Sequence, residues 1–345
     1  MAGPPRKPKA LDTKAPITKP SDAARAITAD LVAVLVAVTD GEPRIMTIAY
    51  AGALPSGPFE FKHRSLQSGL RAWVEAQTGH PLGYVEQLYT FADRGRTGDA
   101  RSPHSVSISY LGLTREDQVG PGFEAHWSGW YDYFPWEDHR AGPPAMLAKM
   151  LTPRLRAWSK SAASPALQRE RWQRVAITFG FDDREWNEEL VLQRYELLYE
   201  SALIPEAVRD GSGAAPVVPG RPMTADHRRI LATGIARLRA KIKYRPVVFE
   251  LMPAEFTLLQ LQRCVEALAG RLVHKQNFRR LMEQQQLVEE TGAIAADTVG
   301  RPAKLFRFRH AVLAERAIAG TNRPLSESIN GQPQFRCPRP HFAAV

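Results

Sequence analysis

The sequence predicts a mixed α+β protein with two folded parts, and two observations lead to this prediction. In the N-terminal half, two β-rich runs flank Asp40-Gly41, a strong signal for a β-hairpin turn. In the C-terminal part, between Phe256 and Phe308, two helical segments with a tight turn between them precede two short strands. The first β-rich run is apolar almost throughout, which is typical of a central strand that is covered on both faces.

Length and charge are the next constraints. A chain of 345 residues is long enough for two domains, each with its own core. The formal net charge is +10 and the isoelectric point is about 9.7, which favours a polyanionic partner. Residues 224–310 hold 16 Lys and Arg against 8 Asp and Glu, a net charge of +8, so most of the positive charge belongs to the C-terminal part.

Cysteine content and hydropathy exclude several classes of protein. Two cysteines, Cys264 and Cys337, are too few for a disulfide framework or a structural zinc site. No apolar run is long enough to cross a membrane, and the N-terminus has no apolar core of a signal peptide. We therefore expect a cytoplasmic protein in a reducing compartment, with a buried and unreactive thiol at Cys264.

Composition divides the chain into successive segments. They are a disordered basic arm (1–27), an N-terminal domain (28–205) with an insertion at about 118–181, a linker (206–223), a second domain (224–310) and a mobile tail (311–345). The arm is poor in large apolar residues, and the linker is rich in Gly, Pro and Ala. At the start of the second domain, Thr224 is expected to cap an amphipathic helix.

The C-terminal part has the pattern of a winged helix-turn-helix. Thr257 is a good N-cap for a first helix, whose apolar residues recur at three- and four-residue steps and which Gly270 ends. A second helix is expected at about 274–285, after a short link. Strands at about 287–289 and 305–308 follow, with the basic segment GRPAK at the tip between them.

The second of these helices carries the residues that we expect to contact DNA. Arg and Lys neutralise phosphates, and Arg, Asn and Gln make bidentate contacts to base edges in the major groove. The candidate base readers are Lys275, Gln276, Asn277 and Arg279, and the candidate phosphate or minor-groove contacts are Arg280, Arg301 and Lys304. The alternative is a solvated basic face on an ordinary helical domain. The spacing of the turn and the basic tip favour double-stranded DNA as a partner.

In the N-terminal domain, a Gly-containing loop and a helix follow the hairpin. Ser65 is expected to cap this helix, whose packing face is Leu66, Leu70, Trp73 and Val74. A strand, a Gly-containing loop and a helix are the layout of a Nudix box, and part of that signature is in register here. Gly57, Arg71 and Glu75 match the signature, whereas His63, Ala72 and Ala76 replace its glutamates and Gly79 comes one position late.

The missing glutamates have a chemical consequence. Nudix hydrolysis relies on several carboxylates that hold Mg²⁺ or Mn²⁺ against a diphosphate. One remaining glutamate does not build such a cluster, so we expect no catalytic residues, no metal site and no cofactor, but a pocket that still binds a ligand. The candidate ligand-binding residues are Arg71 and Glu75 on the helix, and Arg94, Arg96 and Arg101 in the loop between strands expected at 85–91 and 106–113. Guanidinium groups at strand ends suit a diphosphate, and the alternative for this loop is a solvated polar segment.

Three motifs resemble the C-terminal domain of the NrtR- and NadQ-type regulators. They are FELMPAEFTLLQLQ at 249–262, NFRR at 277–280 and GRPAKLF at 300–306. The segment from Leu88 to Leu113 is also similar to the corresponding region of ADP-ribose-type Nudix proteins. The resemblance covers about 28–118 and 224–310, and its motifs are most specific in the C-terminal part.

The resemblance implies both a fold and a function. It implies an N-terminal Nudix-like α/β/α sandwich with a large insertion, followed by a winged helix-turn-helix. It further implies a transcriptional repressor of NAD biosynthesis or salvage genes, in which a catalytically degenerate Nudix domain senses ADP-ribose, NAD, ATP or a related adenine nucleotide. We expect a homodimer whose two DNA-reading heads bind half-sites about one DNA turn apart.

The insertion at about 118–181 sets this chain apart from a plain NrtR and resembles the alphaproteobacterial NadQ branch. Its aromatic residues include Trp127, Trp130, Tyr131, Phe134 and Trp136, which either build a local core or stack on an adenine or a partner subunit. Two other functions stay open. One is a divergent Nudix ADP-ribose pyrophosphatase with an accessory nucleic-acid-binding domain, and the other is a nucleotide-binding, RNA-associated protein.

Overall fold

The structure is a computed structural model. It describes residues 27–50, 52–83, 85–92, 105–116, 122–211, 218–244, 248–295 and 302–311. The expected basic arm and mobile tail lie almost wholly outside these ranges, as do Arg94, Arg96, Arg101 and Arg301. In the part of the chain that the structure describes, no helix combines the length and apolarity needed to cross a membrane.

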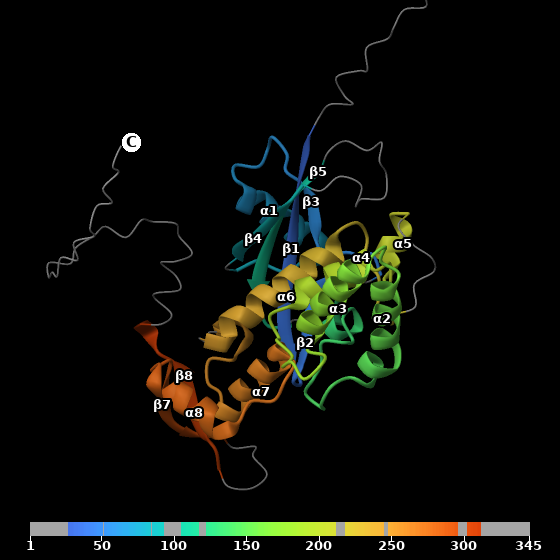
Figure 1. The fold of residues 1–345 in the computed structure, drawn as a ribbon. Coiled ribbons are helices and arrows are strands. Elements are labelled where there is room, and N and C mark those ends of the chain that lie inside the picture. The colour runs from blue at the N-terminus through green and yellow to red at the C-terminus, as the bar shows by residue number, and fades with distance from the viewer. Residues whose placement is uncertain are drawn as a thin grey trace, which may run out of the picture.

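A mixed β-sheet forms the centre of the N-terminal part (Figure 1). Its strands are β1 (Thr28–Thr39), β2 (Glu42–Thr47), β3 (Ser56–Pro58), β4 (Val85–Phe91), β5 (Ser105–Leu113) and β6 (His126–Gly129). The strand order is β4-β5-β1-β2-β6, with β3 paired to β1, and only β1 and β5 run parallel. Asp40 and Gly41 join β1 to β2 with φ angles of 54° and 75°, which confirms the predicted hairpin turn.

The central strand β1 is buried on both faces, as its apolar sequence predicts. Because side chains alternate along a strand, Leu31, Ala33 and Leu35 belong to one core, and the valines between them belong to the other. Helix α1 (Leu66–Thr78) covers the first face, and α6 (His227–Tyr244) lies across the second (Figure 1). The predicted α/β/α sandwich is therefore confirmed.

The two covering helices begin in different ways. Ser65 caps α1 by accepting a hydrogen bond from Ser68 N, as predicted, and Gly79 ends this helix with a φ of 66°. The predicted cap at Thr224 is wrong, because α6 begins only at His227. Ala225, which lies between them, has a φ of 47° and so interrupts any helix that starts at Thr224.

The insertion adds β6 to the sheet and otherwise folds as helices. They are a 3₁₀ turn (Trp130–Asp132), a π-helical turn (Leu147–Leu151), α2 (Thr152–Lys160) and α3 (Pro165–Phe179). After the insertion come α4 (Val191–Glu200), which packs beside α6, and α5 (Pro205–Arg209). The side chains of Trp130, Tyr133, Phe134 and Trp136 are fully buried. They join the core that also contains the inner faces of α6 and α7. Of the roles left open for the aromatic stretch, these four residues build a core, and this core is the main one of the molecule.

The C-terminal part has the predicted order of helix, turn, helix and hairpin. It consists of a 3₁₀ turn (Phe249–Leu251), α7 (Leu258–Ala269), α8 (Lys275–Gln284), β7 (Val288–Ile294) and β8 (Lys304–Phe308). We call α7, α8 and the β7–β8 hairpin the head. Helix α7 also packs against β2 and β1, so the head lies directly on the sheet. Cys264 on α7 is buried and burial raises the pKa of its thiol to about 12, as expected for an unreactive thiol.

Candidate nucleic-acid interface

Helix α8 separates an apolar face from a polar one. Phe278 and Met282, one turn apart, are buried in the main core, and Leu281 beside them is half-buried. The residues on the other sides of the helix are exposed, namely Lys275, Gln276, Asn277, Arg279, Arg280, Glu283 and Gln284. An amphipathic helix held by one face therefore presents a row of long polar side chains to the exterior.

The turn before α8 is fixed by side chains of α7. Thr257 and Gln260 form a capping box at the start of α7, and Gly270 ends the helix with a φ of 72°. The Glu266 carboxylate accepts a hydrogen bond from Val273 N at 2.9 Å, and Gln262 Nε2 donates to Val273 O at 3.0 Å. Sequence reasoning did not single out Gln262 and Glu266. Their signal is that polar residues four apart occupy the buried side of α7.

A groove of about 860 Å³ lies between α8, the start of α7 and the β7–β8 hairpin. Three of the predicted DNA contacts line it: Lys275 and Arg279 from α8, and Lys304 from β8. Lys275 and Arg279 are four residues apart, so they stack on one side of the helix. Neither forms an ion pair with any residue that the structure describes. The fold thus brings cations that are distant in sequence to the two sides of one groove.

Other predicted contacts lie elsewhere, and two acidic residues share the groove. Gln276, Asn277 and Arg280 are exposed on α8 but do not line the groove, and Arg301 lies outside the described residues. Glu283 and Glu290 do line it. Lys304 Nζ lies 2.8 and 2.9 Å from the two oxygens of Glu290, so its charge is partly neutralised within the hairpin. The positive character of the groove therefore comes mainly from the α8 side.

The β7–β8 hairpin is attached to the head by aromatic packing and one backbone bridge. Phe256 and Phe306 exchange backbone hydrogen bonds of 2.9 and 2.8 Å, which adds the segment before α7 to the edge of β8. The Phe308 ring lies 4.4 Å from Phe249 and 4.8 Å from Phe256, measured between centroids. These contacts place the hairpin beside α8, which is the arrangement that a helix in the major groove and a flanking wing require.

Two of the five predicted ligand-binding residues of the N-terminal part, Arg71 and Glu75, lie on α1. Arg71 is half-buried and donates from Nη1 to Leu82 O, whereas Glu75, one turn later, is exposed. Arg94, Arg96 and Arg101 fall outside the described residues, so the structure does not test whether they join this pair. Within the ranges given above, no group of three His, Cys, Asp or Glu side chains is placed to hold a metal ion.

Packing explains two positions of the Nudix-like signature. A Cβ on Gly57 would lie 2.3 Å from the Trp73 ring, so this position must be glycine for α1 to approach β3. His63 stands where the signature has its first glutamate. Its ring stacks on Phe59 with centroids 5.9 Å apart, and its Nδ1 accepts a hydrogen bond from Glu60 N. Gly57 and His63 thus shape the loop before α1.

The first similarity to known proteins concerns the head. Residues 248–308 match the NrtR DNA-binding winged helix domain. A protein of Acinetobacter baylyi, described as an ADPR responsive transcriptional repressor NtrR, is 41% identical over 85 residues. These residues are 24% of this chain and 33% of that protein, so the match spans about a third of the relative's length.

A solved structure extends the likeness to most of the chain. Shewanella oneidensis NrtR, crystallised with a 27mer DNA, superposes with a TM-score of 0.50 at 19% identity. The superposition covers 83% of this chain and 95% of that chain. These matches confirm the resemblance to NrtR-type regulators and the α+β fold, with a Nudix-like part followed by a winged helix. The NadQ branch and the domain boundaries stay predictions.

Proposed function

We propose that this protein is a DNA-binding transcriptional repressor whose Nudix-like part senses an adenine nucleotide. The observation that carries the proposal is the groove beside α8, with Lys275 and Arg279 on the helix and Lys304 on the hairpin. An α-helix fits the major groove of B-DNA, and guanidinium and ammonium groups on its exposed face reach base edges and phosphates. Its head matches the winged helix domain of repressors of this type.

The regulated genes and the effector come from the relatives. The resemblance to NrtR-type regulators implies target genes of NAD metabolism, and the Acinetobacter relative is named for its response to ADPR. We therefore propose that the target genes serve NAD biosynthesis or salvage and that the effector is ADP-ribose, NAD or ATP. Arg71 and Glu75 on α1 are the described residues that we assign to the effector site, together with the three arginines of the 93–101 loop.

We further propose that the Nudix-like part binds its ligand without hydrolysing it and needs no cofactor. Glu75 is the sole glutamate that keeps its place in the signature, and His63 fills the place of another with a packed imidazole ring. Metal-assisted attack on a diphosphate needs several hard oxygen ligands around the cation. With purified protein, Mg²⁺ or Mn²⁺ and ADP-ribose, we expect no release of AMP, and robust turnover would favour the pyrophosphatase alternative.

A homodimer in the cytoplasm completes the proposal. Two heads related by a two-fold axis would bind two half-sites of a palindromic operator. The effector must bind the DNA-competent and DNA-incompetent states with different affinity, because otherwise it changes nothing. Analytical ultracentrifugation with and without a labelled operator duplex tests the stoichiometry directly.

The experiment that tests the proposal is fluorescence anisotropy at fixed salt. Labelled duplexes from upstream of NAD-biosynthesis genes are titrated with protein, with and without ADP-ribose, NAD or ATP. We expect sequence-dependent binding that one of these ligands changes. Salt-sensitive binding without sequence preference or ligand response contradicts it, since phosphate contacts alone give such behaviour. A preference for single-stranded RNA over the duplexes would support the RNA-associated alternative.

A further inference from the structure

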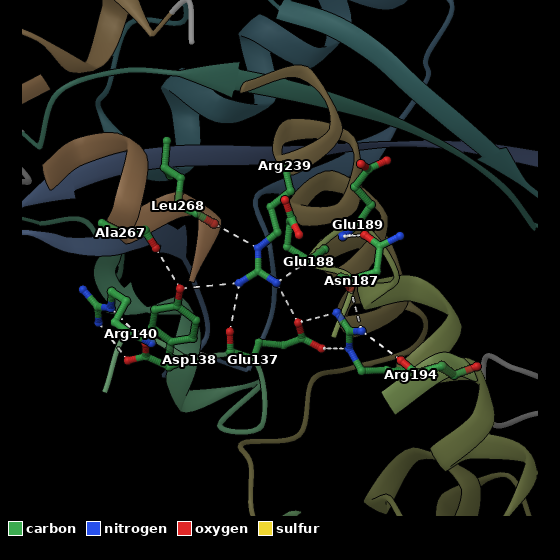
Figure 2. A network of polar contacts seen from close by, with 12 residues as sticks. Glu137, Asp138, Arg140, Asn187, Glu188, Glu189, Arg194, Arg239, Ala267 and Leu268 are labelled. Carbon is green, nitrogen blue, oxygen red and sulfur yellow. Dashed lines mark hydrogen bonds and ion pairs between the residues drawn. The ribbon is translucent and has the colours of Figure 1, made fainter. Parts of the chain in front are cut away.

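A carboxylate from the insertion lies at the centre of a buried polar network. Glu137 is 1% exposed and its carboxylate binds two fully buried arginines (Figure 2). Arg194 from α4 donates from Nε and Nη2 to the two carboxylate oxygens at 2.5 and 2.8 Å. Arg239 from α6 donates from Nη1 to the same carboxylate at 2.6 Å. One acidic side chain from the insertion thus links α4 to α6, which are also joined by the ion pair between Glu196 and Arg229.

The surroundings of Glu137 favour the charged form of its carboxylate. Burial acts to raise the pKa of Glu137, but the charges of Arg194 and Arg239 and their hydrogen bonds outweigh it and hold this pKa below its ordinary value. A buried ion pair gives little net stability over a well-packed apolar group, because both charges lose their hydration. What it does give is a defined geometry, since each donor must meet its acceptor. We therefore asked what the network holds in place.

Its donors hold the last carbonyls of α7. Arg239 Nε donates to Leu268 O at 2.9 Å, and the Tyr131 hydroxyl donates to Ala267 O at 2.7 Å. Just past the helix, His139 N donates to Gly270 O at 2.7 Å. The last carbonyls of a helix have no partner within the helix, and a cation is favoured there by the helix dipole. All three donors come from outside the head, as Figure 2 shows for Arg239 and the carbonyls of α7.

The contact is close enough to constrain the sequence of the turn. A Cβ on Gly270 would lie 2.5 Å from Arg239 Nη2 and 2.5 Å from the Glu137 carbonyl oxygen. Gly270 is therefore required by its φ of 72° and also by the approach of the insertion. The residue after it, Arg271, pairs with Glu188 of the segment before α4 at 3.3 Å. The turn that leads into α8 is thus held on both sides by the insertion and the residues after it.

The same short segment also holds the sheet. Arg140 Nη1 donates to Gly41 O at 2.6 Å, and its Nη2 lies 2.9 Å from the Glu42 carboxylate. From Glu137 to Arg140, the chain therefore contacts the β1–β2 hairpin, helices α4 and α6, and the end of α7. The segment is only four residues long. A displacement of the β1–β2 hairpin relative to α6 must therefore change these contacts.

We propose that the segment Glu137–Arg140, with Tyr131 and Arg239, positions the DNA-reading head on the Nudix-like part. It sets the direction in which α8 leaves the turn after α7, and so sets where the two recognition helices of a dimer lie relative to each other. This role rests on the proposed function for its biological meaning. The residues act through α7 and contact no DNA, so they are positioning residues.

The experiment compares full-length variants that remove single interactions of the network. Tyr131→Phe keeps the ring and removes the hydroxyl, which donates to Ala267 O and accepts a longer hydrogen bond of 3.4 Å from Arg239 Nη2. Operator affinity is measured by anisotropy, beside affinity for a scrambled duplex of equal length. We expect operator affinity to fall about 3- to 10-fold, which corresponds to one neutral hydrogen bond, with unchanged affinity for the scrambled duplex. Binding to a scrambled duplex depends on charge, so head orientation leaves it unaffected.

Hydrogen–deuterium exchange provides a readout that is independent of DNA. We expect the amides of the turn 270–275 to exchange faster in Tyr131→Phe and in Glu137→Gln than in the wild type. The thermal midpoint of Tyr131→Phe should stay close to that of the wild type. The matched control is Arg174→Ala, which breaks the exposed pair between α3 and Glu200. It removes an arginine of the same insertion whose ion pair involves no residue of α7, and we expect unchanged exchange and unchanged operator affinity.

The outcomes separate this inference from the proposed function. If the wild type shows no preference for operator DNA, the proposed function fails, and the exchange data alone decide the positioning role. If the wild type discriminates but Tyr131→Phe and Glu137→Gln bind and exchange as the wild type does, the positioning role is overturned. Equal losses of affinity for operator and scrambled duplex overturn it as well, because they indicate a general loss of folded protein.

Discussion

Arg279 on α8 and Arg239 on α6 are the same residue type in opposite surroundings. Arg279 is exposed beside the groove and pairs with no residue that the structure describes. Arg239 is fully buried, and all three of its guanidinium nitrogens donate to Glu137, Leu268 or neighbouring groups. The difference teaches how to assign the many arginines of this basic chain. An arginine whose donors are satisfied internally shapes the protein, and one whose donors are free is available to a polyanion.

The largest expected effect is on stability and tests the buried side of the comparison. Arg239→Met leaves Glu137 with one arginine and removes the donor of Leu268 O. We expect the free energy of unfolding to fall by about 3–5 kcal/mol, as when one partner of a buried pair is removed. Arg279→Met should change it by less than about 0.5 kcal/mol, because the side chain is exposed. Urea denaturation measures both, and equal effects would abolish the distinction between the two arginines.

The next effect concerns DNA binding and tests the exposed side. Arg279→Ala should weaken operator binding by about 1–3 kcal/mol and relax preference at one base position, if its guanidinium reads a base. Arg280→Ala is the matched control, because it removes the neighbouring arginine that does not line the groove. We expect Arg280→Ala to weaken all duplexes alike, as loss of a phosphate contact does. Anisotropy against single-base operator variants tells the two apart, and a larger, base-specific loss in Arg280→Ala would reverse our assignment.

A smaller effect is a loss of stability in mild acid. Burial lowers the pKa of His227 to about 4, and its Nδ1 accepts a hydrogen bond from Leu54 N at 2.9 Å. The folded protein therefore resists protonation, so the unfolded state binds more protons between pH 6.5 and about 4. His227 contributes its full stability above pH 6.5 and loses it as the pH falls through this window. His139, whose pKa burial also lowers to about 4, acts in the same direction.

His227→Gln tests this dependence, because a glutamine oxygen is also able to accept from Leu54 N. Between pH 7 and pH 4.5, the free energy of unfolding should fall by roughly 1–3 kcal/mol less in the variant than in the wild type. Urea denaturation at several pH values provides the curve. An identical slope in wild type and variant would show that His227 is accessible to protons in the folded state.

The smallest effect is expected for Lys304 on the hairpin. Its ammonium is exposed and already shares the Glu290 carboxylate, so Lys304→Ala should change stability by less than about 0.5 kcal/mol. If Lys304 contacts a phosphate, the variant lowers the slope of log affinity against log salt by about 1. An unchanged slope would assign this lysine to the hairpin rather than to DNA.

Patterns among residues that are close in sequence predicted several helix caps and element boundaries well. Ser65 and Thr257 each cap the helix that follows, as their side chains suggest. The second helix of the head was expected at 274–285 and spans Lys275–Gln284. Strand β4 has the predicted bounds, and β5 begins one residue earlier than expected. Each of these features depends on residues within a few positions of one another, so the sequence carries the information locally.

The buried network escaped prediction because its partners are far apart in the chain. Glu137 and Arg239 are separated by 102 positions, and Glu137 and Arg194 by 57. One local signal was present. Arg228 and Arg239 occupy the three- and four-residue steps of the apolar stripe of α6, beside Leu231, Ile235 and Ile242. Arginines within such a stripe must find buried acceptors, and Arg228 does so at Glu206 and Tyr133 O. At Thr224 the local signal predicted too much. Threonine is suitable as an N-cap, but this does not guarantee that a helix begins there.

Gly270 has a consequence for how such a protein can change over evolution. A winged helix is often regarded as a module that recombines freely with sensor domains. Here the end of α7 has a glycine fitted against the insertion, and its last carbonyls accept hydrogen bonds from the insertion and from α6. A side chain in place of Gly270 would bring its Cβ to 2.5 Å from Arg239 Nη2 and from the Glu137 carbonyl oxygen, so a head without this glycine would not fit against the insertion unchanged. We therefore expect substitutions at this turn of the head to be tolerated only together with compensating changes in the insertion.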